Sequence, residues 1–423
     1  MDSKKKIKIF MISDMALAPS GVARQSMNLA VGLISTGRYK VFQFGGAIKH
    51  ASYTPVKVEP HGEDFIIIPV DGFGDKMKIR TALAVEKPDI VLLFTDPRFF
   101  IHIFEMEDEI HDVCPVAYWN IWDNYPAPKF NHVLYDSCDL LNCINKVAYN
   151  SINEIGLGDK CNYVPHTLPP NMYKQLSEDE IKQHREKIFG KDRVDHFISV
   201  WVNRNARRKQ PGDLLMGWKK FIDKIQKEEG HRNATLVMHT NPQDQEGPNL
   251  FSMIELMDLQ KNVYLSTQKL NDEQMNILYN CADWNINCSS AEGYGLSVLE
   301  CKHVGVPSMT QKTGGLQDQL INEETGEYFG ICREPDCRSL VGSQVVNYIE
   351  DNYLTWDTIC DMFYEAYKMP KDKYDKLSKR CIEDVNERWK YEDMIKKWDE
   401  TIMDTINKFK ESQGKPRFTK HTL

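Results

Sequence analysis

Hydrophobic positions in this 423-residue chain fall in short runs separated by longer amphipathic segments. In the first half, one such helical segment runs to about Thr36, and Ser20 is its expected N-cap. Buried strands are expected at 8–13, 64–70, 89–94, 115–121 and 140–145. Short apolar runs that alternate with helices of roughly 10–15 residues predict βαβ units and a parallel sheet.

The alternation stops over 168–195 and then begins again. Leu168-Pro169-Pro170 interrupts the pattern, a charged helix is expected near 177–191, and we interpret this stretch as a link between domains. Further strands are expected at 197–202, 235–239, 263–266, 284–288 and 307–310. The sequence therefore predicts an α/β protein of two doubly wound, Rossmann-like domains that face a central cleft at the carboxyl ends of both sheets.

The domain bounds follow from the same pattern. We expect a first domain at 1–190, a second at 195–390, and a basic, frayed tail at 413–423. The length suits two cores of ~150–200 residues each.

Composition narrows the function classes. Hydrophobic residues make up 41% and charged residues 27%, which is usual for a globular protein, and the net charge of −8 argues against nucleic-acid binding. No apolar stretch approaches the ~18 residues of a membrane span, so we expect no transmembrane segment and a cytoplasmic location. The eleven cysteines contain no C-x-x-C pair, which argues against a zinc site or a disulfide framework. The oligomeric state stays open.

The strongest chemical signal is the segment from Asn287 to Glu300, NCSSAEGYGLSVLE. A strand is expected to end near Cys288 and a helix to begin near Gly295, with a glycine-containing loop between them. Such a loop lets backbone N–H groups approach an anion at a helix N-terminus. Glu292 and Glu300 flank this site and suit hydroxyl groups at either end of a diphosphate; a capping and a surface carboxylate are the alternative.

This segment resembles the donor-site signature of glycosyltransferase family 4, the retaining E-x7-E enzymes of the GT-B fold. LYNCAD at 278–283, ECKHVGVP at 300–307 and TGGLQD at 313–318 extend the match in the same order. The resemblance implies that Glu292 holds hydroxyls of the donor sugar and Glu300 the ribose. It also implies that phosphates meet the backbone of a short run of residues, Gly293, Tyr294, Gly295, Leu296 and Ser297.

A second match is VNRNARRK at 202–209. In the family an Arg and a Lys five residues apart clamp the diphosphate here, and they correspond to Arg204 and Lys209. Fixed cations would stabilise the charge that develops on the departing nucleotide. The roles of Arg207 and Arg208 stay ambiguous, and a solvated basic turn is the alternative for the whole segment.

The first domain matches the family less closely. Gly21, in PSGVAR, corresponds to the family's glycine turn after the first strand. In YWNIWDNY at 118–125, Trp122 stands where the family usually has His, and Asp123 keeps the neighbouring acid. The aromatic residues there are either a sugar-stacking platform or part of the core. The family's terminal helix crosses back onto the first domain, which we expect of residues 391–412.

No D-x-D sequence is present to hold a cation on a diphosphate, so the resemblance implies a metal-independent reaction without a cofactor. The chain also looks like glycosyltransferases of large algal viruses, which slightly favours a GDP-linked donor such as GDP-mannose, a glycan or other hydroxyl acceptor, and the host cytoplasm. Two alternatives stay open: an epimerase or hydrolase of nucleotide sugars, and a non-catalytic protein that binds them.

Overall fold

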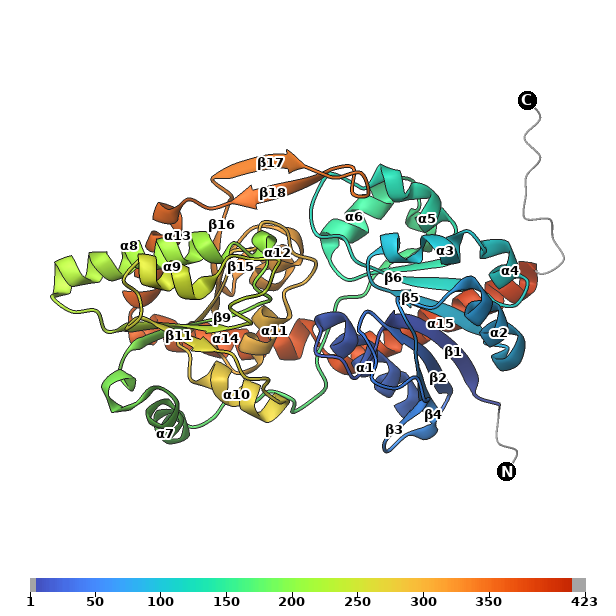
Figure 1. Ribbon diagram of the computed structural model, residues 1–423, viewed down its shortest axis with the longest axis horizontal. Coiled ribbons are helices and arrows are strands. Elements are labelled where there is room, and N and C mark those ends of the chain that lie inside the picture. Colours follow the sequence, from blue (N-terminus) through green and yellow to red (C-terminus); the bar gives the residue numbers. More distant parts are fainter. Residues whose placement is uncertain (1–4, 413–423) are drawn as a thin grey trace.

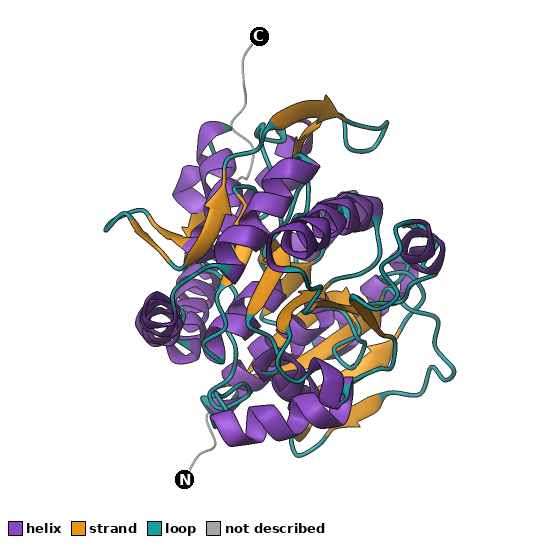
Figure 2. Ribbon diagram, turned by 90° about the vertical axis from the view of Figure 1, so that its left-hand side faces the viewer, coloured by secondary structure: helices purple, strands orange, loops and turns teal. Residues whose placement is uncertain are grey.

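The computed structural model describes residues 5–412, so the predicted tail at 413–423 lies outside the described residues. Two α/β units lie side by side along the long axis (Figure 1). Helices flank the strands of each sheet (Figure 2). The predicted fold class is confirmed.

The first sheet has eight strands in the order β3-β4-β2-β1-β5-β6-β7-β8, parallel except for the β3–β4 pair. The order reverses between β1 and β5. The strands are β1 Ile7–Asp14, β2 Tyr39–Gly46, β3 Val56–Val58, β4 Gly62–Pro69, β5 Ile90–Phe94, β6 Val116–Asn120, β7 Leu140–Cys143 and β8 Cys161–Tyr163. The helices that accompany them are α1 Gly21–Ser35, α2 Lys76–Glu86, α3 Ile101–Phe104, α4 Glu107–His111, α5 His132–Asp136 and α6 Lys146–Glu154.

The second sheet has six parallel strands in the order β11-β10-β9-β12-β13-β16 and reverses between β9 and β12. Its strands are β9 Phe197–Val202, β10 Ala234–His239, β11 Val263–Ser266, β12 Trp284–Asn287, β13 Ser308–Gln311 and β16 Gly330–Arg333. The helices from the link onward are α7 Glu178–Phe189, α8 Pro211–Glu229, α9 Leu250–Leu256, α10 Asp272–Asn280, α11 Leu296–His303, α12 Gly314–Leu320, α13 Trp356–Tyr367, α14 Lys371–Arg388 and α15 Tyr391–Ser412.

Local sequence explains where several of these elements begin. The Ser20 side chain accepts a hydrogen bond from Ala23 N, so it caps α1 as predicted. Ser177 and Glu180 form a capping box at the start of α7. Each predicted strand is present within one or two residues of its expected ends.

Several strands were not predicted. The core strand β2 reads YKVFQFGG, whose polar Lys40 and Gln43 interrupt the apolar run; Gln43 is nevertheless fully buried and donates to Ser13 Oγ at 2.7 Å. Two small antiparallel pairs were also missed, β14 Ile321–Asn322 with β15 Glu327–Tyr328 and β17 Cys337–Val341 with β18 Ile349–Tyr353. Apart from Asn352, which is buried but polar, the second pair consists of exposed or half-buried residues, so it carries no apolar pattern.

Helix α15 packs on the first sheet although it follows the second domain in sequence. Trp398 makes an edge-to-face contact with Trp119 of β6 at 5.3 Å between ring centroids. The Thr401 hydroxyl accepts a hydrogen bond from Asn142 of β7 at 3.1 Å. One buried apolar cluster includes residues of both sheets and of α15, so the two domains share a continuous core.

One contact between the domains is sensitive to pH. The Asp318 carboxylate, on α12, accepts a hydrogen bond from Lys146 N at the start of α6 at 2.7 Å. Burial raises the pKa of this carboxyl from 3.8 to about 7. Between about pH 4 and pH 7 the carboxyl therefore holds its proton in the folded protein but has lost it in the unfolded chain. The stability that this proton contributes is present at low pH and is lost as the pH rises from about 4 to about 7.

We therefore predict that Asp318→Asn stabilises the protein relative to wild type at pH 8, by on the order of 2–4 kcal/mol, with little difference near pH 4. Urea unfolding of both proteins across this range measures the effect. The exposed Glu324→Gln, which removes a carboxylate that does not contribute to the Asp318 shift, is the control and should show no such pH trend. A constant difference between Asp318→Asn and wild type would contradict the assignment.

Candidate functional site

Two loops of the second domain meet where its strand order reverses. One follows β9 and carries the basic residues of 203–210; the other follows β12 and carries the site loop, which we define as residues 288–295. Ligands of doubly wound sheets bind at the carboxyl ends of the strands at such a reversal. Ser290 N donates to Arg208 O at 2.7 Å and fastens one loop to the other.

The centre of the site is a buried ion pair between Lys209 and Glu292. Both side chains are only 8% exposed, and Ser289 Oγ lies 3.1 Å from Glu292 Oε2. Arg208 Nη1 lies 3.8 Å from Glu292 Oε1 and 3.6 Å from Asp123 Oδ2. The structure therefore brings together Lys209, Glu292 and Asp123 of the predicted site and adds Arg208, whose role the sequence left ambiguous.

Charge sets the protonation of this cluster. Burial by itself would raise the pKa of Glu292, but Lys209 and Arg208, together with hydrogen bonds from Lys209 and Ser289, lower it to about 2. Burial and the neighbouring Arg208 lower the pKa of Lys209 from its ordinary value. Burial also raises the pKa of Asp123, against the opposing effect of Arg208. Glu292 is thus a fixed anion at neutral pH.

The glycines of the site loop permit close packing. Gly295 has φ +82° and precedes α11, whose first turn has no side-chain cap. Its N-terminal N–H groups form the kind of site that binds an anion. A Cβ at Gly293 would lie 2.8 Å from Asp123 Oδ1, so the loop passes directly against the first domain. The Tyr294 ring is buried and its hydroxyl donates to His166 O at 2.6 Å, which leaves its backbone for the predicted phosphate role.

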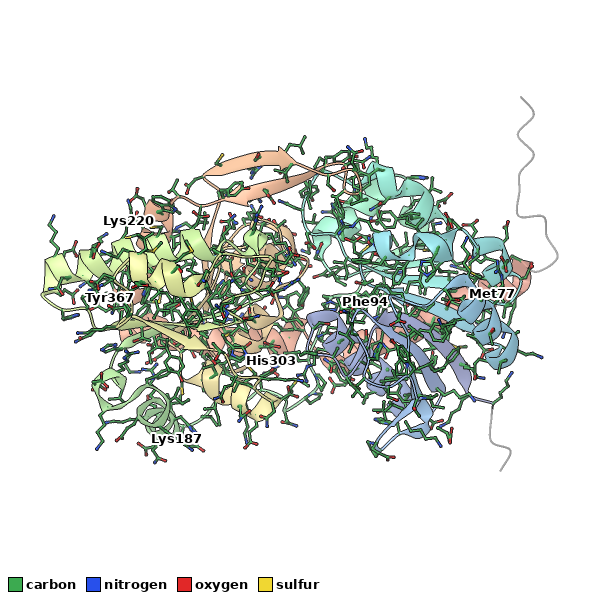
Figure 3. All side chains as sticks on the ribbon, viewed as in Figure 1. Met77, Phe94, Lys187, Lys220, His303 and Tyr367 are labelled. Atoms are coloured by element: carbon green, nitrogen blue, oxygen red, sulfur yellow. The ribbon has the colours of Figure 1, made fainter. Side chains whose placement is uncertain are left out.

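Residues of the first domain contact the site loop and the start of α11 directly. Glu292 N donates to Asp123 O at 3.3 Å. A Cβ at Gly21 would lie 3.2 Å from Leu296 Cδ1, so the start of α1 lies against the start of α11. Phe94, at the end of β5, also lies on the side of the first domain that faces the second (Figure 3). Ser297, in the first turn of α11, is buried.

Glu300 lies in a separate polar cluster at the side of the cleft. Its carboxylate accepts a hydrogen bond from Tyr279, and burial raises its pKa. Close by, Arg24 of α1 forms a two-point ion pair with Asp272 of α10 and joins the two domains. Glu300 thus has different side-chain partners from the Lys209–Glu292 pair.

Arg204 does not join the cluster. Its guanidinium donates to both oxygens of Asp244, at 2.8 and 3.0 Å, and its side chain is 64% exposed. The structure therefore places Arg208, and not Arg204, beside Lys209. The diphosphate role of Arg204 stays a prediction, and to fulfil it the side chain would have to leave Asp244.

Trp122 belongs mainly to the core. It is 5% exposed, its indole N–H donates to Pro126 O at 3.3 Å, and its ring contacts Phe130 at 5.9 Å between centroids. This arrangement favours the core alternative over a stacking platform, although Trp122 also lines a cavity together with Asp123. Two residues that line the same cavity as Asp123, Asp96 and Arg98, were not predicted from the sequence. Their position directly after a predicted parallel strand was the signal that could have identified them.

Residues 5–412 contain no group of three or more His, Cys, Asp or Glu placed to hold a metal ion. No helix in the same range is both long and apolar enough to cross a membrane.

Comparison with known proteins fits this geometry. Residues 184–335 match the family model described as glycosyl transferases group 1. This segment includes β9, β12, both basic loop residues and both glutamates of the predicted site. No curated protein matches the chain by sequence.

Solved structures with the same fold cover nearly the whole chain. Sucrose-phosphate synthase from Thermosynechococcus elongatus has a TM-score of 0.71 at 13% identity, over 95% of this chain and 100% of that one. Anabaena HepE in complex with UDP and glucose has a TM-score of 0.69 at 14% identity, over 94% and 100%. A glycosyltransferase from Rickettsia africae has a TM-score of 0.69 at 16% identity, over 95% and 99%. The fold is therefore GT-B.

We predict strong coupling within the buried pair. Lys209→Met leaves Glu292 buried with only the half-exposed Arg208 near it, and should lower the free energy of unfolding by about 3 kcal/mol, the usual cost of breaking a buried ion pair. Glu292→Gln should cost a similar amount, whereas the double variant should recover much of the loss. Urea unfolding of the four proteins gives the coupling energy. Additive losses would contradict a direct pair.

Proposed function

We propose that this protein is a glycosyltransferase that moves a hexose from a nucleotide diphosphate sugar to a hydroxyl acceptor with retention of the anomeric configuration. The observation that carries the proposal is the buried Lys209–Glu292 pair beside the uncapped start of α11, at the strand reversal of a glycosyltransferase group 1 domain. It supplies a cation and free N–H groups for a diphosphate, and a carboxylate for sugar hydroxyls.

In the proposed reaction the acceptor oxygen attacks the anomeric carbon while the bond from that carbon to the diphosphate breaks. The electron pair of the broken bond stays on the phosphate oxygen, which takes the acceptor's proton on the same face. Lys209, the α11 N-terminus and Arg204, once released from Asp244, would stabilise the growing negative charge. This arrangement supports a reaction without a metal ion, because protein cations occupy the place that a metal would take.

In the absence of substrate Lys209 and Glu292 neutralise each other. A donor would replace this pair with two interactions, phosphate with Lys209 and sugar hydroxyls with Glu292. Because Glu292 has a pKa of about 2, it would remain an acceptor of hydrogen bonds throughout the neutral range. Closure of the cleft over the donor would exclude water and favour transfer over hydrolysis.

The base of the nucleotide sugar donor has to be identified by measuring nucleotide binding. The viral resemblance favours GDP, whereas the Anabaena HepE structure holds UDP and glucose. We predict that calorimetric titration shows saturable binding of one of GDP, UDP and ADP in preference to the others, and that EDTA leaves the affinity unchanged. Binding of none of them, or binding only after magnesium is added, would overturn the metal-free site.

The same titration tests the basic loop. Lys209→Ala and Arg204→Ala should each weaken binding of the preferred nucleotide by ~1.5–3 kcal/mol, the usual contribution of a hydrogen bond to a charged group. Arg207→Ala is the matched control, because this exposed arginine lies in the same loop. Wild-type affinity in the Arg204→Ala protein would show that the arginine keeps its pairing with Asp244 and takes no part.

Glu300 should contribute through the ribose. We predict that Glu300→Ala weakens binding of the nucleoside diphosphate by about tenfold or more while inorganic diphosphate binds as in wild type, since a hydroxyl–carboxylate hydrogen bond is lost. Competition between the two ligands by calorimetry separates the effects. Equal losses of affinity for both ligands would contradict the ribose role.

The alternative functions, an epimerase or a hydrolase of nucleotide sugars, are tested separately by product analysis with a labelled donor.

A further inference from the structure

The β17–β18 hairpin reaches from the second domain to the first. Figure 1 shows it extending along one side of the molecule toward α5 and α6. It follows the end of the family match at residue 335, and its strands pair only with each other. The hairpin, which we define as residues 337–353, therefore lies outside both main sheets.

The end of the connecting segment and the start of β18 are docked on the loop after β6. Glu350 N donates to Tyr125 O at 2.7 Å, and Asn124 Nδ2 donates to Glu350 O at 2.8 Å. The Tyr348 ring contacts Phe130 edge-to-face at 5.0 Å, and its hydroxyl lies 3.2 Å from Ala127 O. Specific hydrogen bonds and an aromatic contact thus hold the hairpin against the first domain.

The base of the hairpin is joined to the site loop. Asn352 N donates to Ser290 O at 2.9 Å, and Ser290 Oγ donates to Asp351 Oδ1 at 2.8 Å. Gln210, next to Lys209, donates to Asn352 O at 2.8 Å. One element therefore contacts the donor loops at one end and the first domain at the other.

A cavity of about 290 Å³ lies between the hairpin and the loops after β5 and β6. This volume is at the small end of the roughly 300–1,000 Å³ of ligand pockets, which suits a single sugar ring. Its walls combine Asp96, Arg98 and Asp123 of the first domain with apolar surface from Trp122, Val341 and Ile349. Asp123 also contacts the Arg208–Glu292 cluster, so the cavity opens beside the proposed reaction centre.

The charges of the cavity select among acceptors. Arg98 is the one cation among the lining residues, and it already donates to both oxygens of Asp96, at 2.8 and 2.7 Å. Asp123 adds a second carboxylate. Asp96 is paired with Arg98, and Asp123 lies 3.6 Å from Arg208, which is not among the lining residues. The lining residues thus offer no unpaired cation for a phosphate or carboxylate group, whereas their carboxylates can accept hydrogen bonds from hydroxyls.

We propose that this cavity binds the acceptor, that the acceptor is a neutral, hydroxyl-rich sugar unit, and that the hairpin forms the wall that decides which acceptors fit. The inference rests on the proposed function, because it takes the neighbouring Glu292 loop as the donor site. The acceptor hydroxyl would enter beside Asp123 and lose its proton to the departing phosphate. The apolar side of the ring would lie on Val341 and Ile349.

Binding measured by saturation-transfer NMR tests the proposal without turnover. The probes are methyl α-D-glucopyranoside and methyl α-D-mannopyranoside as neutral glycosides, with glucose 6-phosphate as the anion, each in the presence of the nucleoside diphosphate. Val341→Trp fills the cavity from the hairpin. Val345→Trp is the matched control, because Val345 is 61% exposed on the same hairpin and does not line the cavity.

We expect a neutral glycoside to bind wild type and Val345→Trp, to lose at least tenfold in affinity for Val341→Trp, and to bind better than glucose 6-phosphate. Asp96→Asn should reduce the difference in affinity between the neutral glycoside and glucose 6-phosphate, because it frees Arg98 to bind the phosphate. Nucleotide titration of each variant reports on the donor site separately: its failure in wild type would remove the proposed function. Normal nucleotide binding with unchanged glycoside affinity in Val341→Trp, tighter binding of glucose 6-phosphate, or no glycoside binding to wild type would overturn the acceptor cavity.

Discussion

The ion pair between Lys209 and Glu292 is the constraint on which the rest of the site depends. Two buried charges are tolerated only when they stay close together and are further hydrogen-bonded. That requirement fixes the loop after β9 against the loop after β12, with Ser289 and Arg208 completing the interactions of Glu292. The remaining contacts, from the Gly293 approach to Asp123 to the hairpin on Ser290, are built on these two fixed loops.

The two domains contribute differently to this site. The second domain holds its charges rigidly, because both loops follow adjacent strands and a hydrogen bond from Ser290 N to Arg208 O joins them. The first domain approaches through backbone and side-chain contacts around Asp123, through Arg24 to Asp272, and through the hairpin on Tyr125. These polar contacts can break singly, whereas the shared apolar core and α15 keep the domains joined.

Much of the fold was predictable because its signals are local. Apolar runs such as IVLLF of β5 identify buried parallel strands, and Ser20 marks the start of α1 by its capping chemistry. Strand β2 was not predicted because the hydrogen bonds that allow Gln43 to be buried are made to residues distant in sequence, Ser13 and Asp14. The β17–β18 hairpin escaped because its stability comes from docking onto another domain, and its exposed residues show no alternation. Spacing alone could not distinguish Arg208 from Arg204, since the choice depends on where Asp244 and Asp123 lie.

In the proposed acceptor cavity, the hairpin would let one fold serve different acceptors. The proposed donor site consists of the loops at the strand reversal, and their buried charges leave little freedom for substitution. The proposed acceptor cavity is lined by Asp96, Arg98 and a hairpin that pairs with neither sheet. Changes in such a hairpin alter the size and charge of the cavity without moving Lys209 or Glu292, because only its base, at Asp351 and Asn352, touches the site loop. Under the proposed assignment, specificity for the acceptor would therefore change independently of the chemistry at the donor.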